Sequence, residues 1–237
     1  VDEEIGMDGV HNLDTSLLKG RKMLNLDGED EGRLTVGCAG AKICDIVIPF
    51  RRSECSGTSV TLKIRDYRGG HSGNDIQNQR GNAHKDMARI LYALGKDYDI
   101  RLMHIEGGMG ANVIAKDCTA EVIIESGKAA AFAQAFEEMG RTVGEEYFGN
   151  EPDMKIMAET GAAGTYDAMD AESTRNVIGF IYASPNGVQT MDRSVEGAVE
   201  TSLNPGVVKT LDSEVRVSFQ CRSSVDSKLI EMMNRLQ

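Results

Sequence analysis

Two neighbouring glutamates near the start of the sequence, Glu3 and Glu4, are of the type found in hydrolytic metal centres. Adjacent side chains diverge, so one carboxylate can ligate a metal ion while the other takes a proton from metal-bound water. Asp27 ends a short apolar run, residues 22–26, and could supply a further oxygen ligand. Such ligands suit zinc, manganese or cobalt. The alternative is a solvated acidic face, the usual role of acidic runs.

His71 stands in the sequence Gly-Gly-His-Ser-Gly-Asn-Asp-Ile, residues 69–76, between a predicted strand and a predicted helix. Glycines permit a backbone with positive φ and a close approach to another group. A histidine held in such a turn, near the start of a helix, can face a ligand. The alternative is an ordinary turn that happens to contain a histidine.

Two further polar residues stand where they could contact a ligand. Asn112 follows three glycines within residues 107–110, which would let its amide approach a ligand from a turn. Arg222 follows a predicted strand and could fork onto a carboxylate. The alternatives are a hairpin turn for the first and a surface salt bridge for the second.

The elements that would position these residues alternate between strands and helices. Helices are predicted at residues 78–94, 127–148, 171–184 and 226–236. Strands are predicted at residues 33–37, 42–50, 59–66, 100–105, 154–158, 195–203, 207–211 and 215–221, with one more strand, 111–125, broken by a turn at 116–117. Short loops join the first three strands, which favours an antiparallel meander. The order predicts an α+β fold: a mostly antiparallel sheet with helices packed on one face.

Composition excludes some partners. The chain of 237 residues has a net charge of −11 and no cluster of basic residues, which argues against nucleic acid as the main partner. Its apolar runs fall short of the roughly 20 residues that span a bilayer, and no signal peptide is visible. Five scattered cysteines without a CxxC pair indicate a reduced set. We therefore expect a cytoplasmic protein without a membrane partner.

Taken together, these residues resemble the metallopeptidase family of aminoacylases, carboxypeptidase G-type enzymes and bacterial dipeptidases. Within that family the likeness is to dipeptidases that hydrolyse Xaa-His or similar dipeptides. The matching stretches are residues 2–7, 24–32, 36–40, 69–76, 80–83, 107–112, 184–188, 200–204 and 222–224. The resemblance implies a two-metal zinc site, with manganese or cobalt possible, and a homodimer formed through an inserted lid (dimerisation) domain.

The resemblance also implies a role for each candidate residue. Glu3 matches the general base, while Glu4 and Asp27 match metal ligands. His71 matches the lid histidine that stabilises the tetrahedral oxyanion. Two residues, Asn112 and Arg222, match those that bind the substrate and its terminal carboxylate. These roles agree with the chemistry of the side chains: a base beside a ligand, an oxyanion donor on a turn, and a cationic fork.

Several metal ligands of the family have no counterpart in the sequence. The family's His-x-Asp motif and bridging aspartate precede the paired glutamates, and its last metal histidine follows the lid. Both ends of the chain look cut from something longer. We therefore expect residues 1–38 to be a remnant of an α/β catalytic domain and residues 39–237 to be the lid, inactive alone. The alternatives are a non-catalytic α+β binding or dimerisation module, or another hydrolase of the family, such as a tripeptidase or an aminoacylase.

Overall fold

The computed structural model describes residues 8–24, 31–32 and 37–237. The chain divides into two compact units, Val1–Cys38 and Ala39–Gln237. The first unit contains a short helix, α1 (Asp8–His11), and a 3-10 turn, η2 (Thr15–Leu17). The predicted base Glu3 and the predicted metal ligands Glu4 and Asp27 lie outside the described residues. The predicted strand at residues 33–37 lies almost wholly outside them as well.

The second unit is built on one eight-stranded sheet with the order β1-β8-β7-β3-β4-β2-β5, and β6 pairs with β7 beside this path. Every strand pair is antiparallel. The strands are β1 (Gly40–Pro49), β2 (Arg52–Arg65), β3 (Arg101–Gly107), β4 (Cys118–Ile124), β5 (Lys155–Met169), β6 (Gly187–Met191), β7 (Val199–Thr210) and β8 (Glu214–Ser223). The predicted antiparallel sheet is confirmed.

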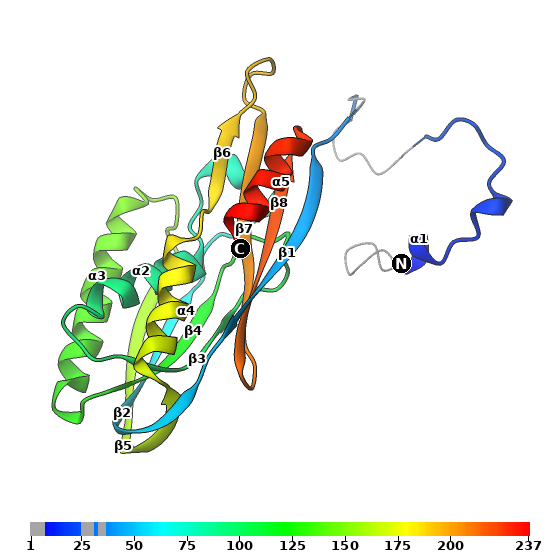
Figure 1. Cartoon of the computed structure of the whole chain (residues 1–237). Helices are drawn as coiled ribbons and strands as arrows, with labels where there is room; N and C mark the ends of the chain where they lie inside the picture. Colours follow the sequence, from blue (N-terminus) through cyan, green and yellow to red (C-terminus); the bar gives the residue numbers. More distant parts are fainter. Residues whose placement is uncertain (1–7, 25–30, 33–36) are drawn as a thin grey trace. The chain divides into compact units, whose positions relative to one another are not determined.

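The longer helices of this unit cover one face of the sheet (Figure 1). They are α2 (Ala83–Leu94), α3 (Ala129–Glu146), α4 (Ala171–Ala183) and α5 (Asp226–Arg235), with short 3-10 turns η3 (Ile76–Asn78) and η4 (Ser126–Lys128). Each helix turns an apolar stripe to the sheet, as its periodicity requires. The predicted α+β class, with helices on one face, is confirmed.

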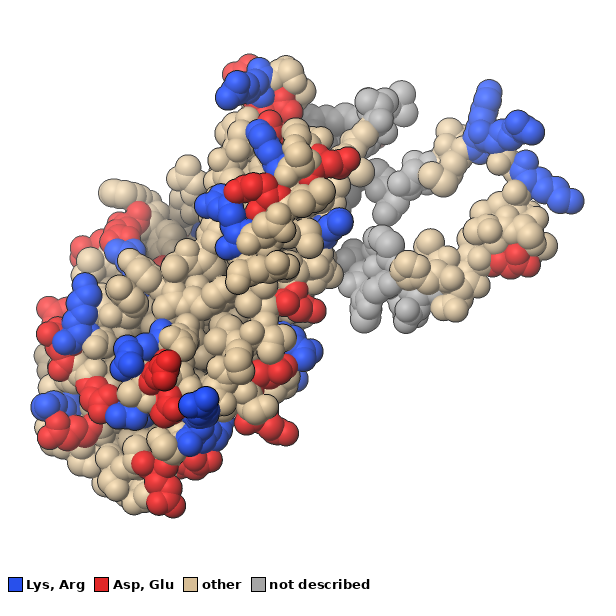
Figure 2. Space-filling model, viewed as in Figure 1, with Lys and Arg blue, Asp and Glu red and all other residues tan. Residues whose placement is uncertain are grey.

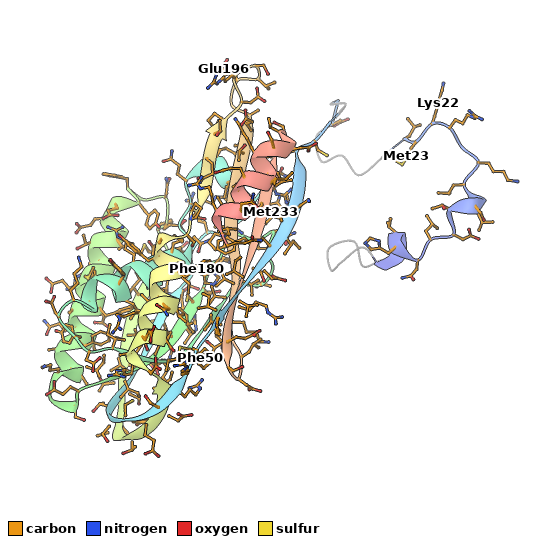
Figure 3. The ribbon with its side chains drawn as sticks, viewed as in Figure 1. Lys22, Met23, Phe50, Phe180, Glu196 and Met233 are labelled. Atoms are coloured by element: carbon orange, nitrogen blue, oxygen red, sulfur yellow. The ribbon has the colours of Figure 1, made fainter. Side chains whose placement is uncertain are left out.

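The core lies between this helical layer and the sheet. Figure 3 shows Phe50, Phe180 and Met233 arriving there from separate parts of the chain. Phe180 of α4 meets Phe219 of β8 edge to face, with ring centroids 6.2 Å apart. Removing the apolar area of core side chains such as these from water stabilises the packing of the helices on the sheet.

Two halves of the sheet meet at a short seam between β3 and β7. Only two positions pair there, Glu106 with Lys209 and Gly107 with Val208. Thr210 extends the seam, because its hydroxyl donates to the carbonyl of Ile105 (2.8 Å) and accepts from the N–H of the same residue (2.9 Å). The ends of β3 and β7 are therefore held by side chains as well as by backbone pairing.

Several sequence predictions were wrong in detail. The first strands form no meander, because β1 pairs with β8 while β2 pairs with β4 and β5. Residues 111–115 form a loop with a single bridge, between His71 and Val113, instead of a strand. Helix α2 starts at Ala83 because Asn82 caps it. Strand β5 continues through a Gly- and Ala-rich stretch whose weak β propensity concealed it, and β6 was not predicted.

Charges of both signs mingle on the surface. Figure 2 shows Lys and Arg interspersed with Asp and Glu over the visible face of the second unit. None of the described helices is long and apolar enough to cross a membrane.

Candidate functional site

His71 lies on a rigid turn, residues 69–75, which we call the histidine turn. Gly69 and Gly70 both have positive φ, 64° and 130°, as the glycine pattern predicted. A side chain at Gly70 would collide with the guanidinium of Arg80. Asp75 closes the turn reciprocally: its N–H donates to the His71 carbonyl (2.9 Å) and its carboxylate accepts from the His71 N–H (2.9 Å).

The ring of His71 is oriented by the backbone of the same turn. The N–H of Asn74 donates to Nδ1 of His71 over 3.3 Å. A neutral imidazole that accepts at Nδ1 carries its proton on Nε2. The exposed His71 side chain therefore presents an N–H donor on the side away from its own turn.

Arg222 meets this ring from a different element. It lies within β8, between Ala41 of β1 and Ser202 of β7, and its Nη2 atom is 3.4 Å from Nε2 of His71. Its Nε atom is 3.5 Å from the hydroxyl of Ser72. A guanidinium can only donate, so Nη2 and a protonated Nε2 cannot bond to each other. An anionic group such as a carboxylate or an oxyanion beside the two nitrogens would accept from both.

Asn112 joins the same neighbourhood through its backbone. It lies in residues 108–114, which we call the asparagine loop. The carbonyl of Asn112 accepts from the N–H of Ser72 (2.8 Å), and the N–H of Ile114 donates to the carbonyl of Gly70 (2.9 Å). The structure therefore brings three of the predicted site residues, His71, Asn112 and Arg222, into one region.

A buried carboxylate fixes both ends of the segment that carries His71. Glu151, which is 4% exposed, accepts from the N–H of Arg68 and from the N–H of Gly81, each over 2.7 Å. Charge-assisted bonds of this kind hold a loop firmly. Sequence reasoning missed Glu151, because it lies 70 residues beyond Gly81 and belongs to no motif.

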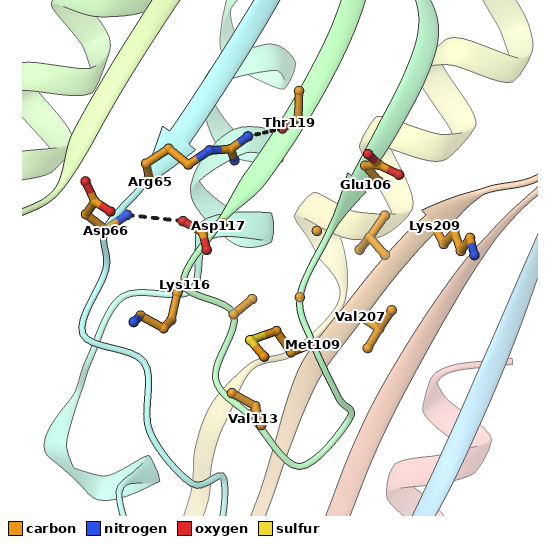
Figure 4. A pocket seen from close by; sticks show the side chains of 14 residues that line it. Arg65, Asp66, Glu106, Met109, Val113, Lys116, Asp117, Thr119, Val207 and Lys209 are labelled. Carbon is orange, nitrogen blue, oxygen red and sulfur yellow. Dashed lines mark hydrogen bonds between the residues drawn. The ribbon is translucent and has the colours of Figure 1, made fainter. Parts of the chain in front are cut away.

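A cavity of about 680 Å³ opens beside the asparagine loop (Figure 4). Its charged lining is of both signs and includes Arg65, Glu106, Lys116 and Asp117. The Arg65 guanidinium donates to the hydroxyl of Thr119, which joins β2 to β4 in the cavity wall. Neither His71 nor Arg222 lines it. We place the candidate site at His71 and Arg222, because their nitrogen donors approach each other, whereas the cationic side chains that line the cavity lie among carboxylates.

The described residues do not supply a metal centre of their own, since no group of three His, Cys, Asp or Glu side chains lies together among them. His84 is also unsuited to binding a metal, because it is fully buried under the β3–β7 seam. Its Nδ1 lies 3.1 Å from the carbonyl of Pro205, and burial lowers its pKa to about 4.

Comparison with known proteins agrees with this fold. Residues 58–151 match the model of the peptidase dimerisation domain. The cytosol non-specific dipeptidase of Escherichia coli (strain K12) is 30% identical over 227 residues, which are 95% of this chain and 47% of that protein. The crystal structure of aminoacylhistidine dipeptidase from Vibrio alginolyticus superposes with a TM-score of 0.86 at 33% identity, covering 100% of this chain and 49% of that one.

The chain therefore contains, over residues 58–151, a region that matches a peptidase dimerisation domain. It is the lid-domain region that is found in these two dipeptidases, and the resemblance seen in the sequence is confirmed. It spans about half the length of the relatives that it matches.

Proposed function

We propose that this chain is the lid-bearing part of a dipeptidase that hydrolyses Xaa-His or similar dipeptides. In this proposal His71 donates from Nε2 to the oxyanion that forms at the scissile carbonyl, and Arg222 and Asn112 hold the terminal carboxylate of the substrate. The approach of Arg222 to His71, 3.4 Å between two donor nitrogens, carries the proposal. The two relatives are themselves described as dipeptidases, one of them an aminoacylhistidine dipeptidase.

The tautomer of His71 supports the oxyanion role. Because Nδ1 accepts from Asn74, the proton on Nε2 needs no rearrangement before it meets developing negative charge. Donors that are already oriented toward such charge contribute a large share of catalysis, and removing one costs about 10²–10³ in kcat. The turn that Asp75 and Glu151 hold would keep this donor in place.

Metal dependence is a part of the proposal that rests on the sequence alone. Glu3 as general base, and Glu4 and Asp27 as ligands, would complete a zinc site with residues from other segments of the parent enzyme. Manganese or cobalt would suit the same oxygen ligands. A bound metal of this kind supplies activated water at neutral pH.

The decisive experiment is to express the full-length parent and assay it on Xaa-His dipeptides with and without a chelator. We expect hydrolysis that the chelator abolishes and added zinc restores, and no hydrolysis by the 237-residue chain alone. Tripeptides and N-acetyl amino acids, tested in parallel, would reveal a tripeptidase or an aminoacylase. Strong chelator-sensitive activity from the isolated chain, or none from the parent on any of these substrates, would contradict the proposal.

We also propose that the parent is a cytoplasmic homodimer that associates through this domain. The match to a dimerisation domain supports the association, and β5 lies at one edge of the sheet with exposed small residues, Gly161 to Thr165. Light scattering of the full-length protein should give twice the monomer mass. A monomer without hydrolytic activity would instead favour a non-catalytic binding module.

A further inference from the structure

A fully buried amide, that of Asn204 on β7, holds the asparagine loop from behind. Its Nδ2 donates to the carbonyl of Ala111 (2.9 Å) and to the carbonyl of Val113 (2.8 Å), the two residues that flank Asn112. With the Asn112 carbonyl bonded to Ser72, three successive carbonyls of the loop have fixed partners. A loop held in this way cannot rotate the peptide groups on either side of Asn112 without losing buried hydrogen bonds.

A second buried amide supports the first. Asn82 is 2% exposed, and its Nδ2 donates to Oδ1 of Asn204 (3.2 Å) and to the carbonyl of Pro205 (3.1 Å). Its own Oδ1 accepts from the N–H groups of His84 (3.1 Å) and Lys85 (3.4 Å), which makes it the cap of α2. The two asparagines thus form a relay from the first turn of α2 to the asparagine loop.

The relay reaches His71 through the loop. The loop bonds to both sides of the histidine, because the Asn112 carbonyl accepts from Ser72 and the Ile114 N–H donates to Gly70, and Val113 bridges to His71 itself. The loop also lies tightly against β7, where a side chain at Gly206 would collide with the carbonyl of Gly110. Both the donor side chain and the substrate-binding side chain therefore depend on the position of one loop.

We infer that Asn204, backed by Asn82, is a positioning residue that sets the asparagine loop and, through it, the geometry of His71 and Asn112. This inference rests on the proposed function for the consequence in catalysis, but not for the position of the loop. The amide is suited to the task because it satisfies two carbonyls and one donor at once, whereas alanine would leave those groups buried and unpaired.

The test compares Asn204→Ala with Thr210→Val. Thr210 is a matched control because it lies on the same strand, is 9% exposed and also bonds across to the β3 side, but it does not touch the loop. Hydrogen exchange in this chain should show the Ser72 and Ile114 amides exchanging at least about tenfold faster in Asn204→Ala only. In the full-length enzyme, Asn204→Ala should lower kcat and raise KM, so that kcat/KM falls at least about tenfold relative to Thr210→Val.

Each outcome decides something. Unchanged exchange at Ser72 and Ile114, or equal acceleration in both variants, would overturn the inference. Faster exchange with unchanged kinetics would confirm that Asn204 sets the position of the loop, but would contradict the proposed roles of Asn112 and His71 in catalysis. Should Asn204→Ala fail to fold, Asn82→Asp serves instead, since aspartate still caps α2 but cannot donate to Asn204 or Pro205. That variant should then show the same local exchange, and its absence would overturn the inference.

Discussion

Arg222 Nη2 and His71 Nε2 lie 3.4 Å apart although 151 residues separate them in sequence. One side chain comes from near the C-terminal end of a strand, β8, and the other from a turn between β2 and α2. A guanidinium can only donate, and a neutral His71 ring that accepts at Nδ1 carries its proton on Nε2, so the two nitrogens cannot bond to each other and an anion beside them would accept from both. The approach of these two side chains links the two halves of the sheet at the proposed site.

His71→Ala in the full-length enzyme should lower kcat about 10²–10³-fold, the cost of removing one oxyanion donor. The side chain is exposed, so the melting temperature should change little. His104→Ala is the matched control, because Nε2 of His104 lies 3.1 Å from the carboxylate of Glu106 on β3 and His104 belongs to no part of the proposed site. Steady-state kinetics and thermal melts check both. A loss of less than about threefold in kcat would remove the oxyanion role.

Arg222→Ala should raise KM for a dipeptide by about 10–100-fold, since a charge-assisted bond to the terminal carboxylate is worth about 1.5–3 kcal/mol. A dipeptide amide lacks that carboxylate, so its KM should hardly respond. Arg222→Lys should recover only part of the affinity, because lysine cannot make the two-pronged contact. Equal losses on the acid and the amide would show that Arg222 acts on the fold and not on the carboxylate.

Glu151→Gln should loosen the segment that carries His71. The carboxylate of Glu151 accepts from the backbone N–H groups of Arg68 and Gly81. In the glutamine variant, the amide NH₂ would face one of these two donors in place of an acceptor oxygen. We expect a loss of about 1–3 kcal/mol in the free energy of unfolding, measured by urea denaturation. Glu137→Gln is the control, because Glu137 accepts a single bond, from Ala158 (3.1 Å), which the glutamine oxygen can keep. Similar losses in both variants would contradict the special role of Glu151.

His84 should make the fold labile to acid. Burial holds its pKa at about 4, against 6.5 in the unfolded chain, so the unfolded state binds more protons below pH 6.5. The contribution of His84 to stability is therefore complete above pH 6.5 and is lost as the pH falls through 4. Between pH 7.5 and 4, urea denaturation should show wild type losing about 3 kcal/mol more than His84→Asn. Parallel profiles for the two proteins would refute this assignment.

The sequence predicted the helices and the mainly antiparallel sheet well, because these depend on local periodicity. The pairing of β1 with β8 could not be predicted, since the residue pattern of 40–49 does not indicate which distant strand will pair with it. The β5 strand was mostly missed, because residues 161–164 have weak β propensity and the strand is held by pairing with β2 on both sides of a register shift. Tertiary contacts decided both cases.

The site was predictable only in part. His71, Asn112 and Arg222 could be found as polar residues beside glycines or a strand end, and the structure does bring them together. The residues that hold them, Asn204 and Glu151, are buried polar groups whose partners lie far away in sequence. A sequence shows that such residues are polar but not that they are buried, so their roles appear only in the fold.

The pairing of β1 with β8 also has a consequence for biosynthesis. The bond from the Ser218 hydroxyl to Asp45 joins residues 173 apart, so the chain has a high contact order at this edge. During synthesis on a ribosome, the backbone groups of β1 stay without their β8 partners until β8 has emerged. The apolar residues of β1, Cys44, Ile46 and Ile48, stay exposed for the same time. Arg222 lies on that same late strand, so a nascent chain acquires the proposed anion position only when the last part of the sheet has closed.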